Sequence, residues 1–160
     1  MPNKKLQIKN KYLPGLVYWL QDLLTGRDSN KIRVEFVNLL QPQITIIENE
    51  RLSLLKKYAK KDEEGNPVVI ISASAKRVYD VPGEEGKKLN EEYGSLLEND
   101  FVLEITEKNF EVIKAAKDLI CNTDYLFGPK DNDSEDKKKE RIQISADYCV
   151  WKEIFEGLDF

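Results

Sequence analysis

Between Ser29 and Lys61 the apolar residues recur every three or four positions, a spacing that places side chains on one face of an α-helix. This stripe consists of Phe36, Leu40, Ile44, Ile47, Leu54 and Tyr58, with Arg51 at the one polar step. At about 1.5 Å per residue, a helix over this segment is a rod of roughly 45 Å, which is long for a chain of this size. Such a rod is typical of a structural spine or a contact surface, and it contains no catalytic motif.

Pro42 lies inside this segment and leaves two interpretations open. Its ring removes the hydrogen bond to the Asn38 carbonyl and crowds that carbonyl, at a cost of about 3 kcal/mol in a helix interior. The helix either continues with a kink or breaks near Leu40. The apolar stripe keeps its phase across Pro42, which favours one continuous, kinked helix. The stripe also predicts which residues are buried, namely Phe36, Leu40, Ile44 and Ile47.

The segment before the long helix predicts a strand and a first helix. Residues 5–9 alternate between polar and apolar, which indicates a short strand or an extended arm. Residues 13–24 place leucines and valine on one helical face, and Pro14 suits the first turn. Gly26 can end this helix. Because the linker over 26–29 is short, the two helices should pack as a hairpin.

Shorter elements are expected downstream. The turn residues 65–67 end the long helix, and the runs 68–71 and 77–81 predict two strands of a hairpin. Residues 101–105 are a further strand candidate. One helix is expected with Glu84 and Glu85 in its first turn. Two more are expected from a cap at Thr106 to about Cys121 and from a cap at Ser145 to Gly157. The segment 129–141 has no apolar residue to bury, so it is predicted to be a mobile charged loop.

The predicted fold class is α+β, predominantly helical, in a single domain over residues 1–160. Its N-terminal helical hairpin with the long kinked helix covers 1–67. A small antiparallel sheet with helices covers 68–128, the mobile loop 129–141 and a C-terminal helix 142–160. Three helices shorter than the long one accompany the sheet.

Charge and composition exclude several classes of function. The net charge of -4 argues against a general affinity for nucleic-acid backbones, which requires a basic face. The chain has no histidine, which removes histidine-based triads and the commonest zinc ligand. Neither a secretory leader nor a membrane span is expected. Cys121 and Cys149 are predicted to be buried free thiols of a reducing cytosol.

Acidic residues form clusters that resemble metal or catalytic sites only in part. The clusters at 62–64, 84–85 and 91–92 lie at a turn, a helix start and within a helix, where acids serve solubility and the helix dipole. Asp80, Glu85 and Lys87 resemble the catalytic residues of a metal-dependent nuclease. Such an enzyme needs its Asp and its Glu-x-Lys motif on adjacent strands, whereas Glu85 is expected to open a helix. The acidic run 131–135 lacks the central Gly and the distal Glu of a calcium loop. The sequence therefore predicts no catalytic residue, no metal and no cofactor.

Basic and aromatic residues allow a second interpretation of the N-terminal fifth. Positive charge concentrates there at Lys4, Lys5, Lys9, Lys11, Arg27, Lys31 and Arg33. With Tyr12, Tyr18 and Trp19 to stack bases, this segment could bind nucleic acid. The helical spacing of the aromatic residues favours a different interpretation, in which the basic residues form a solvated face and the aromatic rings belong to the core. Trp151 and Phe155 could likewise anchor a partner, but docking onto the protein's own core is the favoured interpretation.

The order of several short motifs resembles a known family. The motifs are IKNKYLP at 8–14, LLTG at 23–26, RDS at 27–29, YAKKDEEGNP at 58–67, NEEY at 90–93 and Tyr148-Cys149. Their order is similar to that in a family of small uncharacterised proteins, a domain of unknown function, of bacteriophages and prophages of Gram-positive bacteria. The hairpin at 68–81 and the charged segment 129–141 fit that pattern less well. The resemblance implies a viral origin and a role in the virion tail or in host interaction, and it supplies no site residues.

We therefore expect a phage-encoded, non-enzymatic protein–protein interaction protein, acting in host interaction and defence inhibition or in tail assembly. The partner is another protein, from host or phage, or a second copy of the chain. The alternative is a nucleic-acid-binding regulator that uses the basic N-terminal segment. The expected location is the host cytoplasm, with the virion as the other setting. The predicted partner-binding residues are Arg27, Arg33, Asn38 and Gln41, and the last three are expected to be exposed.

Overall fold

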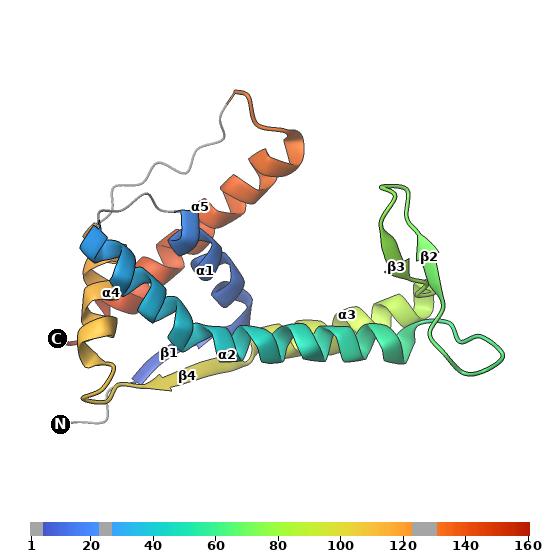
Figure 1. The fold of residues 1–160 in the computed structure, drawn as a ribbon, viewed down its shortest axis with the longest axis horizontal. Coiled ribbons are helices and arrows are strands. Elements are labelled where there is room, and N and C mark those ends of the chain that lie inside the picture. The colour runs from blue at the N-terminus through green and yellow to red at the C-terminus, as the bar shows by residue number, and fades with distance from the viewer. Residues whose placement is uncertain (1–4, 23–26, 123–130) are drawn as a thin grey trace. The chain divides into compact units, whose positions relative to one another are not determined.

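The computed structural model describes residues 5–22, 27–122 and 131–160 (Figure 1). Its elements in chain order are β1 (Lys5–Lys9), the 3₁₀ helix η1 (Asn10–Tyr12), α1 (Leu13–Asp22), α2 (Arg27–Tyr58), β2 (Val69–Ile71), β3 (Arg77–Tyr79), α3 (Gly83–Glu98), β4 (Asp100–Glu104), α4 (Phe110–Asn122) and α5 (Glu135–Glu156). Helices dominate and the strands pair antiparallel, so the predicted α+β class is confirmed. The predicted end of the first helix at Leu23–Gly26 lies outside the described residues.

The chain divides into two compact units. Unit 1 comprises residues 1–43 and 100–160, and unit 2 comprises residues 44–99. The expected organisation was a single domain with a helical part over 1–67. The long helix α2 contributes its first half to unit 1 and its second half to unit 2, so the helical part expected over 1–67 coincides with neither unit.

The sheet of unit 1 joins two strands that are far apart in the sequence. β1 pairs antiparallel with β4, with Leu6 opposite Leu103 and Ile8 opposite Phe101. Leu6 and Ile8 are fully buried, whereas the residue between them is exposed, as the alternation predicts. Both strands were predicted, but their pairing was not. At the end of β1 the buried side chain of Asn10 accepts a 3.0 Å hydrogen bond from Gln43 Nε2 of α2.

Aromatic side chains form the centre of unit 1 and connect α5 with α1 and α2. The ring centroid of Trp151 lies 5.9 Å from that of Trp19 on α1. The rings of Phe155 and Phe36 meet edge to face with centroids 5.8 Å apart, which joins α5 to α2. Gly15 lets α1 approach closely, because a Cβ at this position would lie 3.3 Å from the Trp151 ring. α5 is therefore the helix on which unit 1 is centred.

The charged segment 129–141 is the clearest failure of the sequence-based prediction. Residues 129 and 130 lie outside the described residues. Residues 135–141 are not a loop but the first two turns of α5, which begins ten residues before the predicted cap at Ser145. The cap is Ser134, whose side chain accepts a hydrogen bond from the Lys137 backbone amide. Glu135 pairs with Lys138 at 2.9 Å, and Arg141 Nε lies 2.6 Å from Asp133 Oδ2. Capping and local ion pairs thus support a helical extension that buries little apolar surface.

The long helix α2 runs without interruption from Arg27 to Tyr58, with Pro42 inside it, so the continuous alternative is confirmed. The four stripe residues that were predicted to be buried, Phe36, Leu40, Ile44 and Ile47, are all buried. A Pro in a helix interior leaves the carbonyl four residues earlier without its helical partner, here that of Asn38. The helix tolerates this loss because Pro42 itself is exposed and its ring displaces no core side chain.

Unit 2 consists of the second half of α2, the hairpin β2–β3 and α3. The hairpin has the predicted strands in the register Val69–Tyr79, Ile70–Val78 and Ile71–Arg77. In α3 the apolar side chains are only half-buried, and the helix has no fully buried residue; they are Leu89, Tyr93, Leu96 and Leu97. Much apolar surface of unit 2 therefore remains in contact with water.

Candidate functional site

Of the predicted partner-binding residues, the three whose side chains the structure describes do not form one exposed patch. Asn38 and Gln41 are exposed, as predicted. Arg33 is only half-buried rather than exposed, and its Nη1 donates a 3.0 Å hydrogen bond to the Gln21 carbonyl of α1. Arg33 lies seven residues before Leu40, which is about two helical turns, so it belongs to the buried stripe and not to the polar side. Arg27 opens α2, and its side chain lies outside the described residues.

Of the three aromatic residues that could have stacked bases, only Trp19 belongs to the core. Trp19 is only 2% exposed, Tyr12 is half-buried, and Tyr18 is exposed. Trp151 and Phe155 are fully buried, so the favoured interpretation that they pack on the protein's own core is confirmed. The structure therefore does not combine the N-terminal basic residues with a row of accessible rings.

The acidic clusters are arranged as surface groups. Lys60 Nζ lies 2.9 Å from Asp80 Oδ2, and Glu85 is on α3, where it pairs with Lys88. Over residues 5–22, 27–122 and 131–160, no three acidic or cysteine side chains gather in a way that could hold a metal ion. The helices described in these ranges include none that is long and apolar enough to cross a membrane.

Both cysteines are free, but neither is fully buried, which corrects the prediction. Cys149 is exposed on α5, because its position faces away from the stripe that contains Trp151 and Phe155. Cys121 is half-buried on α4, and burial raises the pKa of its thiol. A raised thiol pKa reduces the thiolate fraction at neutral pH, so Cys121 is a poor nucleophile.

Unit 1 has a pocket of about 150 Å³ between α1 and α5. It is lined by Tyr18, Trp19, Asp22, Lys137, Glu140, Arg141 and Ile144. Sites for small molecules and cofactors usually have a volume of about 300–1,000 Å³, so this pocket is too small for a typical ligand. Its charged residues are of both signs and select no particular ligand.

The hairpin β2–β3 is the feature of the surface that stands out. Its large apolar side chains are exposed, at 43% for Val69, 43% for Ile70, 66% for Ile71 and 40% for Val78. Single exposed apolar residues are common on proteins, but a group of four on one short hairpin is not. A two-stranded hairpin is marginally stable by itself in water, and this one has apolar residues exposed on both faces. It is therefore our candidate contact site.

The base of the hairpin is held by a small network of backbone hydrogen bonds. The Lys60 amide donates to the Asp80 carbonyl at 2.8 Å, and the Val68 amide donates to the Lys60 carbonyl at 2.8 Å. The Asp80 amide donates to the Val68 carbonyl at 2.9 Å. These bonds fix the point at which the chain enters and leaves the hairpin, so the strands extend from a defined base.

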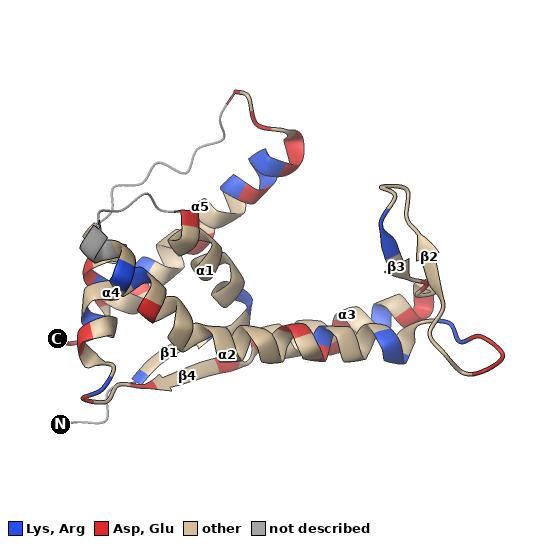
Figure 2. Ribbon diagram, viewed as in Figure 1, with Lys and Arg blue, Asp and Glu red and all other residues tan. Residues whose placement is uncertain are grey.

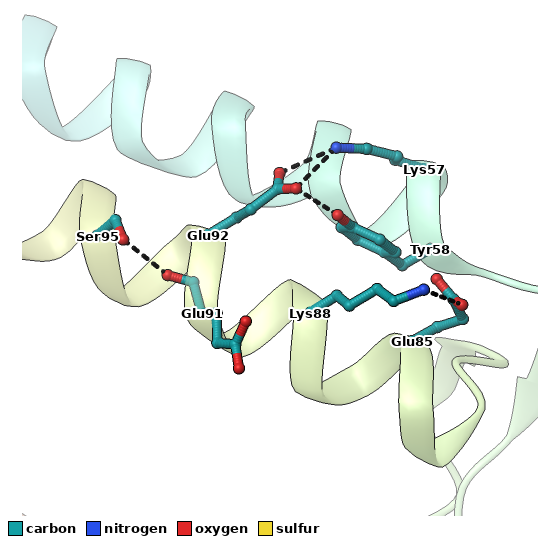
Figure 3. Close-up of polar contacts among 7 residues, drawn as sticks. All are labelled: Lys57, Tyr58, Glu85, Lys88, Glu91, Glu92 and Ser95. Atoms are coloured by element: carbon teal, nitrogen blue, oxygen red, sulfur yellow. Dashed lines mark hydrogen bonds and ion pairs between the residues drawn. The ribbon is translucent and has the colours of Figure 1, made fainter.

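Side chains of α2 and α3 meet directly beside this base (Figure 3). Glu92 of α3 accepts hydrogen bonds from Lys57 Nζ, at 2.8 and 3.0 Å, and from the hydroxyl of Tyr58. These bonds lower the pKa of Glu92, with the Lys57 bond as the larger cause, and they raise the pKa of Lys57. The stabilisation by Glu92 is present above the ordinary carboxyl pKa and is lost as the pH falls through the lowered value. The stabilisation by Lys57 is lost as the pH rises through its raised pKa, so the pair persists between these limits.

We expect the pKa of Glu92 to lie below its ordinary value and to rise in Lys57→Gln. Tyr58→Phe should raise it by a smaller amount, because the tyrosine hydrogen bond is the second cause of the shift. A pH titration of the Glu92 carboxyl carbon by NMR measures both effects. Lys87→Gln is the matched control: it removes a lysine that bonds Glu84 on the same helix, at a spacing that does not bring it beside Glu92, and should leave the Glu92 titration unchanged. The same Glu92 midpoint in the wild type and in Lys57→Gln would contradict the arrangement.

Reasoning from the sequence did not find the hairpin as a contact site, although it predicted the strands. The available signal was the run of β-branched residues at 68–71 in a segment with few apolar residues on either side to cover it. Whether a strand is exposed depends on what packs over it, and periodicity within the strand does not show that.

Comparisons with family models, with curated proteins and with the solved structures found no match to this chain. The fold and the surface thus define the class: a predominantly helical α+β protein that exposes an apolar β-hairpin.

Proposed function

We propose that this chain is a non-enzymatic binding protein that acts by contacting another protein through the hairpin β2–β3. The observation that supports this most is the exposure of Val69, Ile70, Ile71 and Val78 on one short hairpin. Exposed apolar groups of this kind mark protein–protein contacts, because covering them removes apolar surface from water. The partner therefore offers an apolar or strand-like surface to the hairpin.

The side chains around the hairpin are better suited to binding a partner than to catalysis. Two acidic residues of unit 2, Asp80 directly after β3 and Glu92 on α3, are engaged in pairs with lysines of the same unit. The hairpin strands themselves contain one charged residue, Arg77, and otherwise apolar or aromatic side chains. A surface of this composition supplies contact area and no acid or base for catalysis.

We place this activity in a bacteriophage setting on the resemblance of the motifs at 8–14, 23–29 and 58–67. In that setting the bound protein is a host factor, in host interaction or defence inhibition, a component of the virion tail, or a second copy of the chain. The second predicted function, nucleic-acid binding, receives no support from the position of Trp19, which is buried.

A photo-crosslinking amino acid at position 71 tests the proposal in cells that contain the natural partners. Ile71 is the most exposed apolar residue of the hairpin, so we expect irradiation to give an adduct of discrete mass. The matched control carries the same amino acid at position 142, because Ile142 is a large apolar residue of α5 that is 58% exposed. The control should give no adduct of that mass. An absence of adducts at position 71, or the same adducts at both positions, would contradict the proposal.

A further inference from the structure

The outer edge of β2 is open to another strand. The sheet consists of β2 and β3 alone among the described residues, so each strand is an edge. The Ser72 amide donates to the Lys76 carbonyl, and the Val68 carbonyl accepts from Asp80. In an antiparallel ladder, alternate residues of a strand face the partner strand. The amides and carbonyls of Val69 and Ile71 therefore face away from β3.

We propose that this edge pairs with β2 of a second copy of the chain, so that two hairpins form a continuous four-stranded antiparallel sheet. This inference rests on the proposed function and names a partner for it. The two-fold axis passes beside Ile70, which lies opposite Ile70 of the second copy. Val69 then lies opposite Ile71 of the second copy, and their amides and carbonyls exchange hydrogen bonds. A two-fold contact of this kind closes on itself and gives a dimer, not a filament.

The composition of β2 suits pairing with itself. Its three residues are β-branched and uncharged, so the two-fold arrangement places no like charges opposite each other. Natural edge strands are commonly protected from such pairing by a charged residue or a proline, and β2 has neither. The outer edge of β3 carries Arg77 and is protected in this way, which selects β2 as the pairing strand.

The charges at the two ends of the hairpin are complementary (Figure 2). The free end has Lys76 and Arg77, both exposed, whereas the loop before β2 has the exposed acidic residues 62–64. Lys60 and Lys61 flank that loop, but Lys60 pairs with Asp80 and the Lys61 ammonium donates to the Lys56 carbonyl. Antiparallel pairing about position 70 brings the free end of one hairpin toward the acidic loop of the other. Opposite charges therefore meet at both ends of the paired strands.

Charge-swapped variants at position 70 test the dimer and its register together. Ile70→Lys and Ile70→Glu each place like charges opposite each other at the axis, so each variant alone should dimerise at least about tenfold more weakly than the wild type. An equimolar mixture of the two variants should recover a dimer, because the introduced ammonium of one copy then faces the introduced carboxylate of the other. Sedimentation velocity over a concentration series measures the association, and far-UV circular dichroism verifies that each variant retains the wild-type helix content.

Ile142→Lys, a charge introduced at an exposed apolar position of unit 1, is the matched control and should dimerise as the wild type does. A wild type that stays monomeric at every concentration would overturn the pairing. Variants that dimerise like the wild type, or a mixture that stays monomeric while the wild type dimerises, would do the same. Crosslinking from position 71 separates the two proposals. An adduct with a different protein, together with a monomeric wild type, removes the dimer but supports the binding function, and no adduct at all counts against both.

Discussion

Trp151→Ala should lower the free energy of unfolding by about 3–5 kcal/mol, the range typical of truncating a large buried aromatic side chain. Trp151 is fully buried, and its ring packs against α1 at the ring of Trp19 and at the position of Gly15. The loss combines the transfer of the indole to water with the cavity that remains, which α1 cannot fill because Gly15 has no side chain. Since domains of this size are usually stable by about 5–15 kcal/mol, the variant loses a large share of the total.

Urea unfolding followed by far-UV circular dichroism measures this effect. The chain has two tryptophans, so the fluorescence of the variant reports Trp19 alone and should shift to longer wavelength as water reaches that ring. Cys149→Ala, an exposed position on the same helix, is the control and should change the stability by less than about 0.5 kcal/mol. Trp151→Phe keeps part of the packing and provides a measurable intermediate if the alanine variant does not fold. A loss below about 1 kcal/mol in Trp151→Ala would contradict the assigned core.

Pro42→Ala should stabilise the protein by about 2 kcal/mol, which is the opposite direction to most substitutions. Alanine is favoured over proline by about 3 kcal/mol in a helix interior, and the new amide can donate to the Asn38 carbonyl. Proline also restricts the unfolded chain, and losing that restriction offsets about 0.4–1 kcal/mol of the gain. Because Pro42 is exposed, its removal deletes no core contact.

Two measurements examine the Pro42 variant. Chemical denaturation gives the gain in stability, and hydrogen exchange shows whether the amide of residue 42 is protected by a helical hydrogen bond. Asn49→Ala, an exposed change in the same helix, separates the proline effect from ordinary helix propensity and should add about 0.5 kcal/mol or less. An unchanged stability combined with a rapidly exchanging amide at position 42 would show that the helix keeps its local distortion without the proline.

Periodic patterns predicted the helices and the hairpin because the relevant signal lies within each segment. The stripe from Phe36 to Ile47 specifies its buried face by spacing alone, and the structure buries those residues. The same spacing, extended backward by two turns, would have placed Arg33 on the buried stripe. The error at Arg33 came from its charge, since a long charged side chain can lie partly buried and still bond a backbone carbonyl.

Features that depend on distant segments were less accessible. The strands at 5–9 and near 101–105 were both recognised, yet nothing within either segment specifies that they pair with each other. The start of α5 was misplaced because residues 135–141 have no apolar periodicity, and their helix continues from the buried turns around Trp151. The exposure of Val69 to Ile71 was missed for the related reason that burial is decided by the neighbours of a strand.

Unit 1 is built from two segments that are separated in the sequence by unit 2, and this affects how the chain folds during synthesis. Residues 44–99 are made before β4, so β1 has no strand to pair with until the whole of unit 2 has left the ribosome. Until then the apolar residues Leu6 and Ile8 remain uncovered by their partner strand. Closing a sheet over so long a stretch of chain requires a large loop to be ordered first, which slows folding. The hairpin β2–β3, whose strands are neighbours in the sequence, can form early, so the proposed contact site can be present on the nascent chain before the core around Trp151 is complete.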